Sequence, residues 1–104
     1  MPAEFVVDVT RTAEADAEDI WRFIANDSPD AADRFLRELK KQVATLERVP
    51  ERCASIPENE LMGTAYRHLV YGDYRTVFRV AGRRVVVLRI VHGARLMDSS
   101  MFDR

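Results

Sequence analysis

Arginines recur through the last third of the chain, where they interrupt runs of β-branched residues that favour strands. Arg75, Arg95 and His92 are the residues whose types fit a reaction at a phosphate. A guanidinium binds phosphate through paired hydrogen bonds, and a histidine can transfer a proton near neutral pH. Such a set could hold a nucleic-acid backbone or stabilise the charge that builds on phosphorus during RNA cleavage. The alternative is a solvated, arginine-rich face with a strand-end histidine bonded to backbone.

A sheet must position these residues. Strands are predicted at residues 66–71, 74–80 and 84–91. The two-residue turns Gly72-Asp73 and Gly82-Arg83 connect them. Successive side chains of a strand point to opposite faces, so the pairing register decides which residues meet. If both turns have two residues, Val70 and Ile90 lie opposite Arg75 on its two sides.

This register divides the side chains between two faces. One face carries the basic residues with two apolar ones, namely His68, Arg75, Val77, Arg79, Leu88 and His92. The other face is apolar enough to meet helices and contains Leu69, Thr76, Phe78, Val80, Val85 and Val87. Arg67 and Arg89 do not fit, because they fall on the apolar face. Arg89 would either reach an acidic helix residue or be moved by a bulge.

Two helices are predicted ahead of these strands. A short strand at residues 4–9 precedes the first helix, for which Thr10 or Thr12 is the candidate N-cap. Ser28 and Pro29 begin the second helix, which ends before Pro50. The short connection between the helices predicts an antiparallel hairpin.

The order β-α-α-β-β-β predicts an α+β fold in which the helical hairpin packs on one face of a mostly antiparallel sheet. The other face of the sheet would then be uncovered. Residues 1–104 are expected to form a single domain. Residues 98–104 are expected to be a flexible tail, although Met101 and Phe102 could dock.

Composition excludes several classes of function. No apolar run is long enough for a membrane span, and we predict a cytoplasmic protein. Cys53 is the single cysteine, so no internal disulfide forms, and no metal-ligand spacing or cofactor motif is present. Residues 1–65 contain 8 basic and 14 acidic residues, whereas residues 66–104 contain 8 basic and 3 acidic ones. This asymmetry predicts either an anionic partner for the basic part or self-neutralisation between the two parts.

The helices also carry more apolar residues than one buried stripe requires: Ile20, Trp21, Phe23, Ile24, Phe35, Leu36 and Leu39. Part of this surface could accept the helix or strand of a partner. A generously packed hairpin core explains the same residues equally well.

Several segments together resemble the RelE/ParE superfamily of bacterial type II toxins: AEADAEDIWRFIANDSPDAADRFLREL, TLERVPERC, YRHLVYGDYRTVFRV and VVVLRIVHGAR. The resemblance covers nearly the whole chain and implies the fold expected above. It also implies a hetero-oligomer with a cognate antitoxin, whose disordered C-terminal segment folds around the toxin. The residues expected to bind the antitoxin are Ile20, Trp21, Ile24, Phe35, Leu39 and Arg79.

The superfamily divides by mechanism. RelE-type members are ribosome-dependent mRNA endonucleases, and Arg75 in DYRTVF and Arg95 in HGAR match their arginines, with His92 as a substitute acid or base. Met101 and Phe102, however, occupy the region of the C-terminal tyrosine of that branch, and its lysines before the strand arginine are missing.

ParE-type members share the fold and inhibit DNA gyrase by binding it. The helix pair and the VLRIVHGAR ending are closer to this branch, so we favour a gyrase inhibitor over the endonuclease that acts on ribosomes and mRNA. A third alternative is an inactive homologue that only binds an antitoxin.

Overall fold

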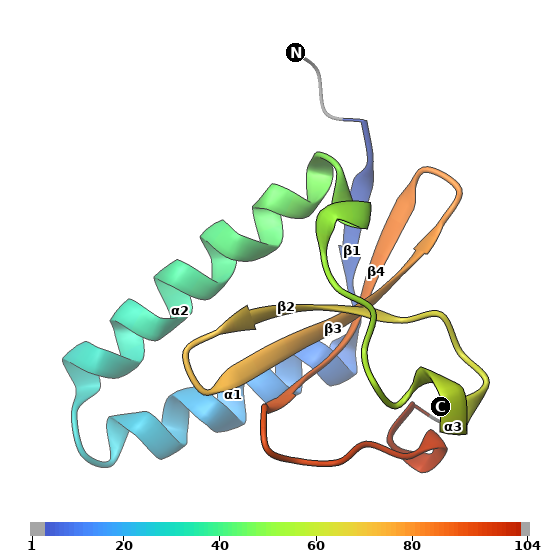
Figure 1. The fold of residues 1–104 in the computed structure, drawn as a ribbon. Coiled ribbons are helices and arrows are strands. Elements are labelled where there is room, and N and C mark those ends of the chain that lie inside the picture. The colour runs from blue at the N-terminus through green and yellow to red at the C-terminus, as the bar shows by residue number, and fades with distance from the viewer. Residues whose placement is uncertain (1–3, 103–104) are drawn as a thin grey trace.

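The computed structural model describes residues 4–102 and contains two long helices packed on a four-stranded sheet (Figure 1). The elements are β1 (Val6–Val9), α1 (Arg11–Ala25), α2 (Pro29–Ala44), the short α3 (Asn59–Met62), β2 (Arg67–Tyr71), β3 (Tyr74–Ala81) and β4 (Arg84–His92). The sheet has the strand order β1-β4-β3-β2, with β1 parallel to β4 and the other neighbours antiparallel. The predicted α+β class and element order are confirmed, with α3 as an addition in the loop.

Both long helices begin at the residues that the sequence indicates. The Thr10 side chain accepts a hydrogen bond from the Ala13 N–H, and Ser28 Oγ accepts one from the Ala31 N–H. These bonds satisfy backbone donors that a first helical turn leaves unpaired. Pro29 occupies the first position of α2, where its missing N–H removes no helical bond.

The pairing of β3 with β4 is displaced by one residue from the prediction over Tyr74 to Val77. Val70 lies opposite Arg75 as expected, but Val91 rather than Ile90 lies opposite Arg75 from β4. The cause is a register shift between Val77 and Phe78, which leaves Leu88 of β4 without a directly paired residue. A bulge near Arg89 was one of the two explanations predicted for the place of this arginine on the apolar face.

The bulge moves His92 to the other face, so its predicted place beside Arg75 is wrong. His92 pairs with Tyr74, and the two rings lie 5.6 Å apart. The Tyr74 ring in turn lies 5.3 Å from the ring of Phe35 in α2. His92 therefore belongs to the helix-bearing face, whereas Arg75 and Arg79 point to the far face.

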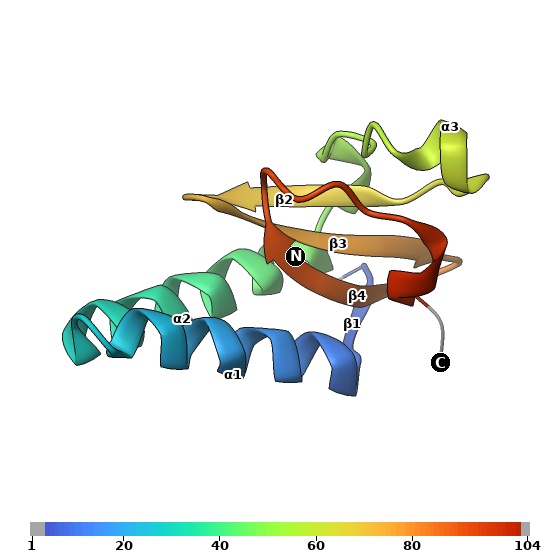
Figure 2. The ribbon, with the colours of Figure 1, turned by 90° about the horizontal axis from the view of Figure 1, so that it is seen from below.

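The far face of the sheet is covered in part, contrary to expectation, although Val70 and Arg79 remain exposed there. Figure 2 shows the chain after β4 crossing the sheet on the side opposite the long helices. Residues 99–102 form a short 3-10 helix there, so Met101 and Phe102 dock. The second apolar core under this segment consists of Ile56, Val77, Val91 and Met97, with Met62, Tyr66, Met101 and Phe102 packed against it. The larger core lies between sheet and helices and includes Leu46, Phe78, Val85 and Val87.

Arg89 and Asp16 connect α1 to the edge of β4. The Arg89 guanidinium donates to both carboxylate oxygens of Asp16, at 2.7 and 2.9 Å, and also to the Met101 carbonyl. Asp16 Oδ2 additionally accepts the Ile90 N–H at 2.9 Å, beyond the point where β1 ends. The predicted contact of Arg89 with an acidic helix residue is thus confirmed together with the bulge.

Replacing Asp16→Ala should lower the free energy of unfolding by about 2 kcal/mol, because Arg89 and the Ile90 N–H lose a largely buried acceptor. Urea denaturation measures this change. Asp19→Ala is the control, since Asp19 is an exposed acid on the same helix, and its effect should stay within about 0.5 kcal/mol. Equal effects of the two substitutions would contradict the structural role of Asp16.

Candidate functional site

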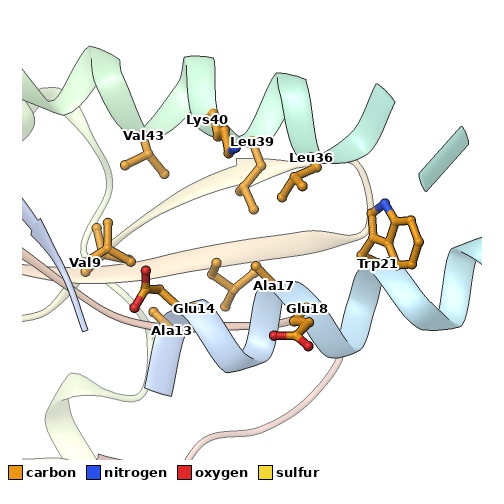
Figure 3. Close-up of a pocket in the computed structure, with 12 residues that line it drawn as sticks. Val9, Ala13, Glu14, Ala17, Glu18, Trp21, Leu36, Leu39, Lys40 and Val43 are labelled. Atoms are coloured by element: carbon orange, nitrogen blue, oxygen red, sulfur yellow. The ribbon is translucent and has the colours of Figure 1, made fainter. Parts of the chain in front are cut away.

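An apolar groove lies between α1 and α2 on the helix-bearing face of the sheet (Figure 3). Its volume is about 480 Å³. The lining residues, called the helix groove below, are Val9, Ala13, Glu14, Ala17, Glu18, Trp21, Leu36, Leu39, Lys40, Val43, Val87 and Ile90. Apart from Glu14, Glu18 and Lys40, all of them are apolar or aromatic, so the groove presents a hydrophobic surface with a charged rim.

The groove exists because the two helices differ in side-chain size along the facing surfaces. α1 presents Ala13 and Ala17, whereas α2 presents Leu36, Leu39 and Val43, whose side chains point toward α1 in Figure 3. Side chains four residues apart share one helix face, so the two alanines form a continuous strip of small side chains on α1. At the hairpin end, Trp21 Nε1 donates to Asp33 Oδ1 at 3.0 Å and ties α1 to α2.

The six residues that were expected to bind an antitoxin lie in three different places. Trp21 and Leu39 line the helix groove. Phe35, Ile20 and Ile24 instead form the inner packing of the hairpin against Ile90 and the tyrosines at the β2–β3 turn. Arg79 lies on the far face of the sheet, where it borders a different cleft.

Arg75 is engaged in a buried ion pair rather than exposed on an open face. Its side chain is 6% exposed, and its Nη1 and Nη2 donate to the two Glu58 carboxylate oxygens at 3.0 and 2.5 Å. Arg75 Nη2 also donates to the Arg95 carbonyl at 2.7 Å, and the Met97 N–H donates to Glu58. Both terminal nitrogens that would bind a phosphate are therefore already occupied.

The hydrogen bonds from Arg75 lower the pKa of Glu58 from 4.5 to about 2, against the opposing effect of burial. Glu58 thus stays ionised throughout the physiological pH range. His68, on the same face, has a lowered pKa because burial and the nearby Arg75 charge disfavour its cationic form. A neutral His68 adds no positive charge to this part of the sheet.

The three residues expected to act in catalysis border one depression of about 450 Å³, but their functional groups are not arranged together. Arg75 faces Glu58, and the His92 ring packs beside Tyr74 while its Nδ1 accepts the Ala94 N–H at 3.1 Å. Arg95 is exposed, and its backbone carbonyl rather than its guanidinium contacts Arg75. Among the described residues, these groups form no phosphate-binding cluster.

Three arginines of the last two strands are paired with acidic residues from the N-terminal part of the chain. Arg89 pairs with Asp16, Arg84 with Asp8, and Arg75 with Glu58. Arg67 donates to backbone carbonyls of the preceding loop. Of the two predicted explanations for the charge asymmetry, self-neutralisation therefore accounts for Arg75, Arg84 and Arg89, whereas Arg79, Arg83 and Arg95 are exposed.

The described part of the chain gives little support for metal binding, for a membrane-spanning helix or for a reactive thiol. Residues 4–102 contain no group of three or more histidine, cysteine or acidic side chains that could hold a metal ion. No described helix is long and apolar enough to cross a membrane. Cys53 is buried, and burial raises the pKa of its thiol, which disfavours the reactive thiolate.

Sequence reasoning missed several residues of these sites. Glu58 lies in a loop with no periodicity, and nothing in the sequence marks it as the partner of Arg75 rather than of any other arginine. Val9, Ala17 and Val43 line the groove through the way the two helices pack on the sheet, which the apolar spacing of each helix alone does not specify. Leu36 was named among the apolar helix residues but not assigned to a binding site.

Comparisons with known proteins agree with this fold. Residues 7–97 match the family model described as ParE toxin of type II toxin-antitoxin system, parDE. A solved structure described as a chromosomal ParDE toxin-antitoxin system from P. aeruginosa has a TM-score of 0.66 and 23% identity, covering 88% of this chain and 98% of that chain. A toxin-antitoxin complex, RelBE2 from Mycobacterium tuberculosis, has a TM-score of 0.61 and 26% identity, covering 86% and 98%. The curated proteins contain no match.

Replacing Glu58→Gln should destabilise the fold by about 3 kcal/mol near neutral pH, because Arg75 would remain buried without its counter-charge. The folded-state pKa of Glu58 lies below its ordinary value, so this contribution is complete above pH 4.5 and disappears as pH falls toward 2. Urea titrations at several pH values should show the difference between the two proteins shrinking over that interval. The exposed Glu60→Gln serves as control, and a difference that stays constant with pH would contradict the assignment.

Proposed function

This chain belongs to the family of ParE toxins of type II toxin-antitoxin systems, and from that premise we propose that it inhibits DNA gyrase by binding rather than by cleaving RNA. The observation that carries the proposal is the state of Arg75. Its guanidinium is buried against Glu58 and the Arg95 carbonyl, so it cannot receive a phosphate without breaking a buried ion pair.

The runner-up function, a ribosome-dependent mRNA endonuclease, needs Arg75, Arg95 and His92 around one phosphate. The bulge in β4 turns His92 toward Tyr74 and the helices, so its ring lies away from the Arg75 guanidinium. General acid–base catalysis requires the proton-transferring group within hydrogen-bond reach of the reacting atom. An inhibitor that acts as a protein-binding surface has no such requirement.

The helix groove is proposed as the binding site of the cognate antitoxin. The two similar structures named above are both toxin-antitoxin systems, which supports a partner of this class. An amphipathic helix or extended segment of the antitoxin would place apolar side chains against Leu36, Leu39 and Val43. Glu14 and Glu18 on one rim and Lys40 on the other favour a segment with basic residues facing α1 and an acidic residue facing α2.

The proposed hetero-oligomer forms in the cytoplasm and needs no cofactor. Of the residues expected from sequence, Trp21 and Leu39 would touch the antitoxin directly. Ile20, Ile24 and Phe35 would act by holding the two helices in place.

A variant without Arg75 separates the two mechanisms. Because loss of one ion-pair partner destabilises the fold, both partners are replaced by apolar residues in Arg75→Met/Glu58→Leu, a change that is often tolerated at buried pairs. We expect the purified, folded double variant to inhibit gyrase supercoiling within about threefold of the unchanged toxin, and neither protein to cleave mRNA on translating ribosomes.

Translation-dependent mRNA cleavage that is lost in the double variant, with gyrase supercoiling unaffected by either protein, would overturn the proposal in favour of the endonuclease. Inhibition of neither gyrase nor translation by a well-folded toxin would favour the homologue that only binds an antitoxin. His92→Ala is a useful companion, because His92 is exposed and its loss should leave gyrase inhibition intact.

A charge placed in the helix groove should disrupt antitoxin binding. Leu36→Arg puts a guanidinium into an apolar surface, and we expect the dissociation constant of the antitoxin complex to rise at least about 30-fold. The matched control is Phe23→Arg, the same kind of change at a side chain that is 71% exposed on α1 and outside the groove. Calorimetric titration measures both, and equal affinities for the two variants would exclude the groove as the principal contact.

A further inference from the structure

The methionines that the structure describes gather in one place. Met62, Met97 and Met101 all belong to the apolar core on the far face of the sheet. Among the described residues, the two other apolar cores contain no methionine. Thioethers, which peroxides oxidise to sulfoxides, are therefore concentrated where residues 93–102 pack against the sheet.

Residues 93–102, called the strap below, cross the far face without joining the sheet (Figure 2). Its apolar attachment comes from Met97, Met101 and Phe102, of which Phe102 packs on Tyr66 with ring centroids 5.1 Å apart. Methionines thus supply two of these three apolar contacts. Hydrogen bonds add to them at several points: the Gly93 N–H donates to the Asp73 carbonyl, Arg75 to the Arg95 carbonyl, the Met97 N–H to Glu58, and Arg89 to the Met101 carbonyl.

The three methionines differ in their access to solvent. Met97 is 6% exposed, whereas Met62 and Met101 are half-buried. Met101 also lines a cleft of about 400 Å³ on the far face, where polar side chains such as the exposed Arg79 form part of the wall. A small polar solute therefore reaches the Met101 thioether in the folded protein, but reaches Met97 only after the strap has moved.

We propose that Met62 and Met101 form an oxidation site for small peroxides, and that their oxidation releases the strap from the far face of the sheet. The strap is then closed in the reduced protein and loosened in the oxidised one. The site depends on the fold alone, so it holds whichever target the toxin inhibits.

The reaction requires only the thioether and the peroxide. A sulfur lone pair attacks one oxygen of hydrogen peroxide, the O–O bond breaks, and an S–O bond forms. The hydroxide that leaves takes the proton of the transferred oxygen and becomes water. The sulfur is oxidised by two electrons as the peroxide is reduced, and thiol-dependent methionine sulfoxide reductases reverse the change.

A sulfoxide does not suit the core that the thioether occupies. Its oxygen is a hydrogen-bond acceptor, and burying it among Val77 and Val91 without a donor is unfavourable. The Arg89 guanidinium is already bonded to Asp16 and to the Met101 carbonyl. An oxidised Met101 side chain therefore finds a donor by turning out into the cleft, which removes one of the apolar contacts that hold the strap.

Trypsin cleavage after Arg95 reports whether the strap is docked, because the Arg95 carbonyl is bonded to Arg75 in the closed form. Proteolysis of a folded protein proceeds through local opening, so its rate follows the population of the open form. After treatment of the purified toxin with hydrogen peroxide, peptide mass mapping should find sulfoxide at Met62 and Met101 before Met97. Cleavage at Arg95 should then be at least about fivefold faster, and a methionine sulfoxide reductase should restore the original rate.

The matched variant is Met62→Leu/Met101→Leu, which keeps apolar side chains of similar size and removes both sites of oxidation. We expect trypsin to cleave its strap within about twofold of the original rate, before and after peroxide. Cys53 and Met97 remain in this variant, so it also reports oxidation at either of those residues.

A second variant needs no oxidant. Met101→Gln places a polar side chain of similar length in the core and should accelerate cleavage of the strap at least about threefold. Leu61→Gln is its control, because Leu61 is 93% exposed beside Met62, and it should leave the rate unchanged.

Equal acceleration by peroxide in the double leucine variant would overturn the proposal, because the effect would then arise at another residue. Sulfoxide at Met62 and Met101 without faster cleavage at Arg95 would also overturn it, as would equal rates for Met101→Gln and Leu61→Gln. A far-ultraviolet spectrum of each protein separates release of the strap from unfolding. Loss of the whole fold on oxidation would contradict a strap that opens on its own.

Discussion

Burying a guanidinium with a carboxylate removes both from water, and their attraction offsets that loss only when the remaining hydrogen-bonding atoms also find partners. Arg75 and Glu58 meet most of this condition through two direct bonds, the Arg95 carbonyl and the Met97 N–H, whereas the buried Arg75 Nε has no hydrogen-bond partner within the described chain. Three segments that are distant in sequence therefore meet on the far face of β3. They cover the second apolar core, so the part of the far face around Val77 and Val91 becomes buried.

This closure changes which surfaces can bind a partner. A wet, positive sheet face would attract RNA, but Arg75, Arg84 and Arg89 are paired with carboxylates of the chain itself. On the other side, small side chains at Ala13 and Ala17 keep the helices from filling the space between them, so an apolar groove persists. Apolar surface that the chain does not bury itself favours burial against a partner. The apolar groove thus lies on the helix-bearing side of the sheet, whereas the exposed Arg79 lies on the opposite face.

The parts that the sequence predicted are those set by local rules. Ser28 and Pro29 specify a helix start through their own backbone, and the β2–β3 register follows from a two-residue turn. The position of His92 was wrong because one unpaired residue, Leu88, shifts every later side chain of β4 to the opposite face. The partner of Arg75 could not be found because it depends on where a loop without periodicity folds back, and all acidic residues are equivalent before that contact is known.

The bulge at Leu88 is supported by groups outside the sheet. β1 ends at Val9, and beyond it the Thr10 N–H and hydroxyl bond to the carbonyls of Val87 and Leu88, while Asp16 accepts the Ile90 N–H. The edge of β4 is therefore satisfied by the start of α1 instead of by a strand. Because α1 is bonded there, the Asp16 carboxylate also reaches Arg89 and, through it, the Met101 carbonyl. One irregular residue in β4 thus lies between Val87 and Ile90, which line the helix groove, and the far-face contacts of Arg89 with Met101.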